Sequence, residues 1–309
     1  MTGTILLALL PIVLLIGLGA ALRRSRFLGE AFWPQAERLG YYVLLPSLFV
    51  HGLVTAPLEG IPIGALVTVL VTSTLLVAGL LLAGRRFLNL EGAAFTSVFQ
   101  GGVRFNNYVG VSVAAGLFGA QGIALAAVAN AAIVPTVNIL CVLVFARFGA
   151  LGRPSLAGLL RLLAFNPLVV ACLVGIGLKS AGLGLPGGIA PALRALGQAS
   201  LPLGLLCVGA ALDFGTARAW VRPVLVASGA KFIAMPLATL AACLALGLHG
   251  PAAATALLFQ ALPTASSSYI MARQLGGDAP LMAGITAVQT VLAGLTMPLV
   301  LIGLLDLVG

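Results

Sequence analysis

Long apolar stretches separated by short polar breaks run through the whole chain. A helix needs about 20 apolar residues to cross the hydrocarbon core of a bilayer. A water-soluble fold could not cover this much apolar surface, because 61% of the residues are hydrophobic and only 7% are charged. We therefore expect an all-α polytopic membrane protein in a lipid bilayer. The breaks predict ten transmembrane helices at residues 4–22, 36–54, 62–83, 92–117, 121–146, 164–181, 197–213, 223–247, 251–274 and 281–305.

Little of the chain is left outside these spans, and the longest connection, residues 147–163, is too short for a soluble domain. Residues 1–309 are therefore expected to form a single membrane domain. The first span has basic residues after it, at Arg23 and Arg24, rather than before it. A cleaved signal peptide has the opposite arrangement, so we expect residues 4–22 to be a retained helix.

The net charge of +9 is distributed unevenly between the two sides of these spans. Only Lys179 and Arg194 follow even-numbered spans, whereas the basic residues after odd-numbered spans are Arg23, Arg24, Arg26, Arg38, Arg85, Arg86, Arg147, Arg153, Arg161, Arg218, Arg222 and Arg273. Cytoplasmic loops carry the excess of positive charge. The pattern predicts an inner or plasma membrane protein with both termini outside, and it indicates no nucleic acid partner.

The four cysteines each lie in a different span, and they form no C-x-x-C pair. Small packing residues are the expected role, so we predict no metal and no cofactor. His51 and His249 fall at predicted outer ends of spans, where solvated side chains are expected.

A weak internal repeat appears when the sequence is shifted by about 160 residues. Phe99-Gln100 then falls on Phe259-Gln260, and Ala127-Val128 falls on Ala287-Val288. Five spans is an odd number, so two copies would cross the membrane in opposite senses. Residues 1–150 and 160–309 are therefore predicted to be inverted repeats, an architecture of secondary transporters whose substrate site lies at the midplane between broken helices.

Two points of predicted helix interruption occupy matching places in the two copies. Gly101-Gly102 weakens span 4, and Pro263 removes a backbone donor from span 9. The surrounding polar groups could cap or line such breaks. These groups are Asn106, Asn107, Thr264, Ser266, Ser267 and Ser268.

Arg104 lies at the predicted centre of span 4, where a charged side chain costs about 3 kcal/mol or more to insert. No carboxylate of the chain is predicted at the same depth. A guanidinium suits a carboxylate ligand, so an external anion is one interpretation. The alternative is that Arg104 braces unwound carbonyls or reaches the membrane surface.

Lys231, in span 8, has a similar choice of roles. It could neutralise a substrate, replace a bound sodium ion, exchange protons, or reach the cytoplasmic surface. Asn138 in span 5 and Gln289 in span 10 could touch ligand or join helices. The predicted substrate-binding residues are Arg104, Asn106, Asn107, Asn138, Lys231, Pro263, Thr264, Ser266, Ser267 and Gln289.

Several of these motifs together resemble the auxin efflux carrier family of the bile acid/auxin transporter superfamily. They are RFNNYVG at 104–110 followed by LFG, PTVNIL at 135–140, LPLGLLCVGAAL at 201–212, KFIAMPL at 231–237 and LPTASSSYIMARQLGGD at 262–278. The resemblance implies ten helices in two inverted five-helix repeats, with broken helices 4 and 9 crossing. It also implies a scaffold of spans 1, 2, 6 and 7, a mobile unit of spans 3–5 and 8–10, often a dimer, and organic anions as substrates.

Pro263 matches the crossover proline of the family's second repeat, and Asn106 or Asn107 matches the crossover asparagine of the first. A proline is expected shortly after these asparagines, but Val111-Ser112 stands there, which leaves the unwinding point of span 4 open. Serine replaces the second crossover asparagine of plant members, so the family's substrate does not carry over.

We therefore expect a secondary active transporter that moves small organic acids by alternating access, with proton or sodium coupling left open. The alternative is a cation or proton exchanger of similar architecture, although such proteins usually place paired carboxylates at the crossing. An enzyme is not expected, because the spans hold no Ser/His pair, paired aspartates or H-E-x-x-H motif.

Overall fold

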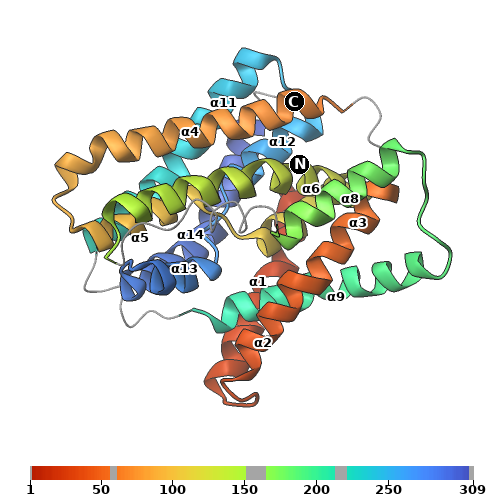
Figure 1. The fold of residues 1–309 in the computed structure, drawn as a ribbon, viewed down its shortest axis with the longest axis horizontal. Helices are drawn as coiled ribbons and strands as arrows, with labels where there is room; N and C mark the ends of the chain where they lie inside the picture. Colours follow the sequence, from red (N-terminus) through yellow and green to blue (C-terminus); the bar gives the residue numbers. More distant parts are fainter. Residues whose placement is uncertain (1, 56–60, 151–164, 213–220, 306–309) are drawn as a thin grey trace. The chain divides into compact units, whose positions relative to one another are not determined.

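The computed structural model describes residues 2–55, 61–150, 165–212 and 221–305, and every regular element in these ranges is a helix (Figure 1). This confirms the predicted all-α class. The elements before residue 150 are α1 (Thr2–Arg24), α2 (Phe32–Leu39), the π-helix η1 (Gly40–Leu44), α3 (Leu45–Thr55), α4 (Ile63–Leu88), α5 (Gly92–Val103) and α6 (Asn107–Phe148). Those after it are α8 (Pro167–Ser180), α9 (Ile189–Ala210), α10 (Val221–Gly229), the π-helix η3 (Ala230–Ala234), α11 (Met235–Leu246), α12 (Gly250–Gln260), α13 (Ser267–Leu275) and α14 (Ala279–Leu305).

Five helical stretches of the described chain are long and apolar enough to cross a membrane. They are Ile63–Leu88, Gly92–Phe148, Ile189–Ala210, Val221–Leu246 and Ala279–Gly303. The protein is therefore a multi-pass membrane protein. Ten spans remain a prediction, because several of the expected spans are short or interrupted helices, such as α8 with its 14 residues.

Local chemistry explains where several helices begin and end. Asn166 precedes α8, and its side-chain oxygen accepts hydrogen bonds from the backbone N–H groups of Leu168 and Val169. This satisfies two of the donors that lack partners in the first turn of a helix. Gly247 and Gly276 end α11 and α13 in the left-handed conformation, which glycine adopts without strain.

Both predicted interruptions are present. The helix α5 ends at Val103, and Arg104 has an extended conformation (φ −75°, ψ 161°) before α6 begins at Asn107. The helix α12 ends at Gln260, and six residues, 261–266, separate it from α13. The unwinding point that the sequence left open is therefore Arg104–Asn106, on the N-terminal side of the second asparagine.

A kink divides α6 where the sequence separates the expected spans 4 and 5. Gly119 has φ 56° and ψ −134°, a combination that residues with a Cβ avoid. The chain on either side of this glycine is helical.

The described chain forms two compact units. The first unit comprises residues 1–63, 107–131 and 162–211, and the second comprises 64–106, 132–161 and 212–309. Each unit draws on both halves of the sequence. These units are a different division of the chain from the predicted repeats, residues 1–150 and 160–309. The repeats remain a prediction, as do the scaffold and mobile roles of the spans.

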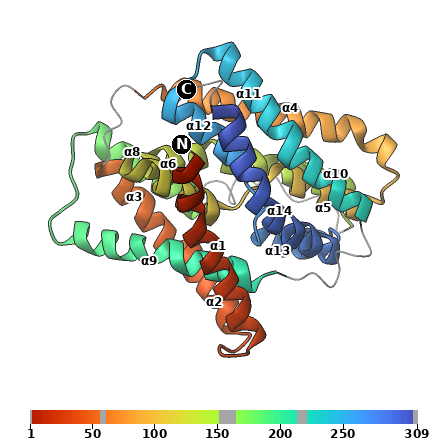
Figure 2. The same ribbon diagram turned by 180° about the vertical axis from the view of Figure 1, so that it is seen from behind.

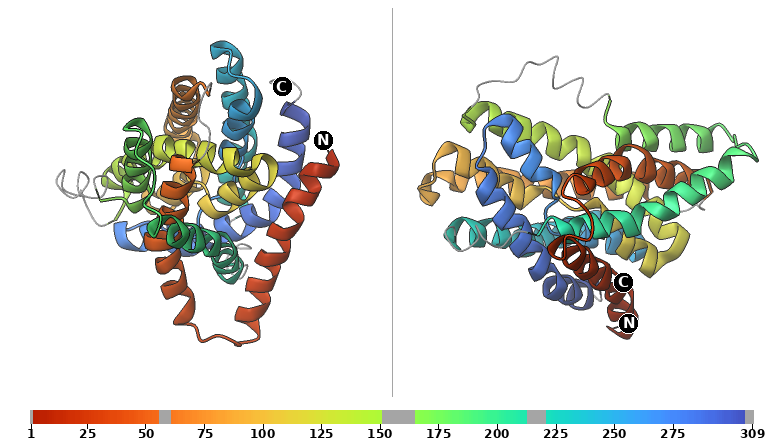
Figure 3. Two further views of the ribbon diagram at one scale, coloured as in Figure 1. Left: turned by 90° about the vertical axis from the view of Figure 1, so that its right-hand side faces the viewer. Right: turned by 90° about the horizontal axis from the view of Figure 1, so that it is seen from below.

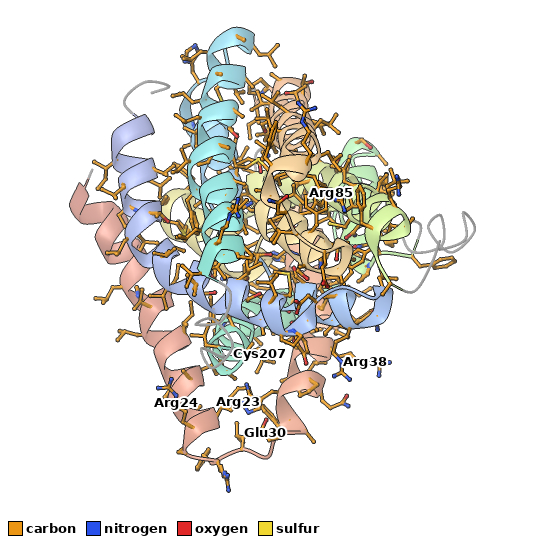
Figure 4. All side chains as sticks on the ribbon, turned by 90° about the vertical axis from the view of Figure 1, so that its left-hand side faces the viewer. Arg23, Arg24, Glu30, Arg38, Arg85 and Cys207 are labelled. Atoms are coloured by element: carbon orange, nitrogen blue, oxygen red, sulfur yellow. The ribbon has the colours of Figure 1, made fainter. Side chains whose placement is uncertain are left out.

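Small residues allow close packing inside the first unit, where α1 packs along α9 and α3 packs against α8 and α9 (Figures 2 and 3). A Cβ atom at Gly19 would collide with the backbone of Leu206, and one at Gly209 would collide with the backbone of Ile16. Membrane helices commonly use glycine for such backbone contact. Figure 4 shows Arg23 and Glu30 at the turn after α1, where they form an ion pair with an N–O distance of 3.2 Å.

In the second unit, α5 packs against α10, α13 and α14. Gly101 faces Ile285 and Ala227, and Gly102 faces Leu81 and Ala230. The glycines that weaken the helix therefore also bring its neighbours close. This packing surrounds the end of α5 with helices from the second half of the chain.

Candidate functional site

The two helix breaks meet through their backbones in the second unit. The N–H group of Asn106 donates a hydrogen bond of 2.8 Å to the carbonyl of Pro263. Breaks in a buried segment leave backbone groups without helical partners, and each must be satisfied within the protein. Here one break supplies the donor and the other supplies the acceptor. The structure thus brings Asn106 and Pro263 together, as the sequence predicts.

Arg104 lies at the end of α5 and reaches two other helices, α13 and the part of α6 that belongs to the same unit. Its Nε donates to Ser268 Oγ at 3.0 Å, and one terminal nitrogen donates to Asn138 Oδ1 at 2.9 Å. The other terminal nitrogen is 3.4 Å from Ser267 Oγ, and the Met271 sulfur is 3.5 Å from the first. All these acceptors are neutral. Among the residues that the structure describes, the guanidinium is therefore held by neutral groups alone.

Carboxylates are scarce throughout the described part of this unit. Glu91 precedes α5 on the surface, and Asp278 accepts a hydrogen bond from Leu281 N at the start of α14. The ion pair Arg23–Glu30 belongs to the first unit. Arg104 is half-buried, so its positive charge has incomplete access to solvent and no anionic partner among the described residues. Such a charge is costly and attracts an anion.

The helix ends around Arg104 affect its electrostatics. Arg104 follows the C-terminal end of α5, whose partial negative charge favours a cation. Ser267 and Ser268 lie in the first turn of α13, whose N-terminal N–H groups favour an anion. A carboxylate beside Arg104 would therefore meet positive potential from the guanidinium and from the start of α13, and negative potential from the end of α5.

Gln289 joins the two breaks and is fully buried. Its Oε1 accepts a hydrogen bond from Thr264 N at 3.0 Å, and its Nε2 donates to Gly101 O at 3.0 Å. Thr264 Oγ1 is in turn 3.2 Å from Ser268 Oγ, which connects this network to Arg104. Both the oxygen and the nitrogen of the Gln289 amide bond backbone groups, which favours the helix-joining role over direct contact with a ligand.

Lys231 lies in the π-helix η3 and is fully buried. No hydrogen-bond partner of its Nζ is present among the described residues. The alternative that the side chain reaches the cytoplasmic surface is therefore wrong for this conformation. A π-helix inserts one extra residue into a turn, and such insertions often occur at functional sites.

Two other predicted site residues lie at the ends of the breaks. Asn107 begins α6 and belongs to the first unit, and Ser266 is half-buried just before α13. Met271 was absent from the predicted site. It lies three residues after Ser268 on α13, and this helical spacing could have indicated that both face Arg104.

Comparison with known proteins agrees with these observations. Residues 151–301 match a family model described as "Membrane transport protein". The chain is also 26% identical over 298 residues to an uncharacterized transporter from Methanothermobacter thermautotrophicus. That match covers 94% of this chain and 95% of the relative. Both findings confirm the resemblance to the auxin efflux carriers.

Proposed function

We propose that this chain, whose residues 151–301 match a membrane transport protein family, is a secondary active transporter that moves small organic anions across an inner or plasma membrane. The substrate carboxylate binds at Arg104, beside the breaks between α5 and α6 and between α12 and α13. Transport proceeds by alternating access, in which the site opens to each side in turn.

The observation that carries this proposal is the environment of Arg104. The guanidinium sits at a helix break among neutral acceptors, and the described part of its unit offers no carboxylate to pair with it. The contacts at 3.4 Å to Ser267 and 3.5 Å to Met271 are longer than good hydrogen bonds. An incoming carboxylate can replace them with two short, charge-assisted bonds.

The fully buried Lys231 gives the same unit a second basic side chain without a partner among the described residues, and a bound anion would favour its protonated form. Arg104 and a protonated Lys231 suit an anionic substrate better than a metal cation, so these side chains give no support to a metal-cation exchanger. The proposed architecture is ten spans in two inverted repeats, with both termini outside. The paired breaks at Arg104–Asn106 and Ala261–Ser266 support it.

The test is uptake of labelled mono- and dicarboxylates into proteoliposomes that contain the purified protein. We expect Arg104→Ala to abolish uptake, because no other described group donates a bidentate pair at this break. Arg104→Lys keeps the charge but loses the planar fork, so the affinity should fall by about tenfold or more.

Arg222→Ala is the matched control, since this exposed arginine of the same unit contacts only the Phe87 carbonyl in the described structure. It should transport like the wild type. Unchanged uptake by Arg104→Ala, in protein that still melts cooperatively, would contradict the assignment. Sodium or proton flux without any organic acid would instead favour the exchanger.

A further inference from the structure

Gln100 is a buried amide for which the described structure provides no partner. Its side chain is fully buried on α5, and neither Oε1 nor Nε2 has a hydrogen-bond partner among the described residues. An unpartnered buried polar group destabilises a protein, and an amide has both a donor and an acceptor to satisfy. Such a group calls for an explanation, and an absent ligand is one.

The repeat-related residue Gln260 shows what a structural glutamine does at this position. It lies on α12 before the second break, and its Nε2 contacts Leu70 O, Ser73 Oγ and Thr74 Oγ1 on α4 at 2.8–3.0 Å. It therefore joins two helices. Gln100 stands at the corresponding place before the first break and joins none through its side chain.

The backbone places Gln100 on the side of α5 that leads to Arg104. Arg104 N donates to Gln100 O at 2.8 Å, so the two residues are one helical turn apart. Arg104 directly follows the last residue of α5, and its own backbone is extended (φ −75°, ψ 161°). Ser97, three residues before Gln100, donates to Asp278 O at 2.7 Å. Gln100 thus lies between two residues whose side chains both reach the segment 267–278.

We propose that Gln100 is a second direct ligand of the transported anion and that it selects acids with a hydrogen-bond donor beside the carboxylate. This inference rests on the proposed function. The Nε2 group donates to a carboxylate oxygen whose partner oxygen binds Arg104. The Oε1 atom then needs a donor, because a carboxylate can only accept. A hydroxyl on the carbon next to the carboxylate supplies it, so the substrate class is small 2-hydroxy acids.

Two matched pairs of acids test this selection: lactate with propionate, and malate with succinate. The members of each pair differ by one hydroxyl. Ligand-induced shifts in melting temperature measured across a concentration series give the affinity of each acid. The wild type should prefer the hydroxylated member by about tenfold, because the acid without the hydroxyl leaves the buried Oε1 without a donor.

Gln100→Met replaces the amide with an apolar side chain of similar size. We expect it to lower the affinity for the hydroxy acid about tenfold and to remove the preference within each pair. It should also raise the melting temperature of the ligand-free protein, because a buried polar group without a partner is removed. Gln260→Met is the matched control, and it should lower the melting temperature because its three acceptors on α4 lose their donor.

Gln100→Glu adds an independent measurement. A carboxylate one turn from Arg104 would occupy the place of the substrate, so this variant should melt at a higher temperature and bind no organic acid. Wild-type affinity and preference in Gln100→Met would overturn the proposal. A Gln100→Met protein that is destabilised or fails to fold would do so as well, because it would show Gln100 to be structural.

Arg104→Ala separates this inference from the proposed function. If Arg104→Ala loses acid binding and Gln100→Met keeps the wild-type selectivity, only the proposed role of Gln100 is refuted. If Arg104→Ala binds acids as the wild type does, the proposed function itself is refuted.

Discussion

Gln289 provides the sharpest test of how the two helix breaks are held together. Its amide bonds two backbone groups that have no helical partner: the N–H of Thr264, inside the second break, and the carbonyl of Gly101, in the last turn of α5. Both residues are buried. Gln289→Met keeps the size of the side chain and leaves both backbone groups unsatisfied.

The expected loss follows from these two groups. Each buried backbone group without a partner costs about 1–3 kcal/mol, so the variant should lose about 2–6 kcal/mol of stability. Side-chain hydrogen bonds in membrane proteins average about 0.6 kcal/mol, because the unfolded state in the bilayer also finds partners. We expect the larger value here, since a break fixed between packed helices cannot reform a helix. At about 2 °C per kcal/mol for a large domain, the melting temperature should fall by about 4–12 °C.

The assay is the melting temperature of purified variants in one detergent, with circular dichroism as the signal. Thr286→Val is the control on the same helix. Its hydroxyl donates only to Met282 O in the turn before it, so its loss should shift melting by no more than about 2 °C. If Gln289→Met melts like Thr286→Val, the bridge between the breaks does not contribute as argued.

Two further predictions concern glycines. Gly101→Ala should lower the free energy of unfolding by about 1–3 kcal/mol, because the new Cβ would lie 2.7 Å from Ile285 Cγ2 and 3.0 Å from Ala227 Cβ. The control is Gly79→Ala, in open space on α4, which should not destabilise the protein. Equal melting temperatures for the two variants would contradict the packing argument. Gly119→Ala should lower the free energy of unfolding by about 1–3 kcal/mol in the same assay, since alanine does not tolerate φ 56° with ψ −134°. A melting temperature equal to that of the wild type would show that the kink does not need glycine.

Much of the candidate site follows from residues that are close together in sequence. Gly101-Gly102 and Pro263 weaken helices by their own backbone chemistry, and the structure has its breaks immediately after the glycines and around the proline. Arg104 stands out because an arginine in an apolar stretch of this length needs a polar partner. These features can be recognised one segment at a time.

The partners of these residues could not be recognised in that way. Asn138 and Ser268, which hold Arg104, lie 34 and 164 residues further along the chain. The sequence offers several asparagines and a run of three serines, and nothing local distinguishes the ones that reach the guanidinium. The π-helices η1 and η3 were also missed, because one extra residue in a turn leaves the composition of an apolar stretch unchanged.

The sequence by itself determined that this is an all-helical membrane protein that resembles a transporter family and has two interrupted helices, because apolar length, backbone-breaking residues and ordered motifs are local properties. Only the tertiary structure decided that Asn106 bonds Pro263, that Gln289 supports both breaks, and that Gln100 differs from Gln260. Those facts depend on which helix packs beside which. Packing is a cooperative result of the whole chain, so no single stretch of residues encodes it.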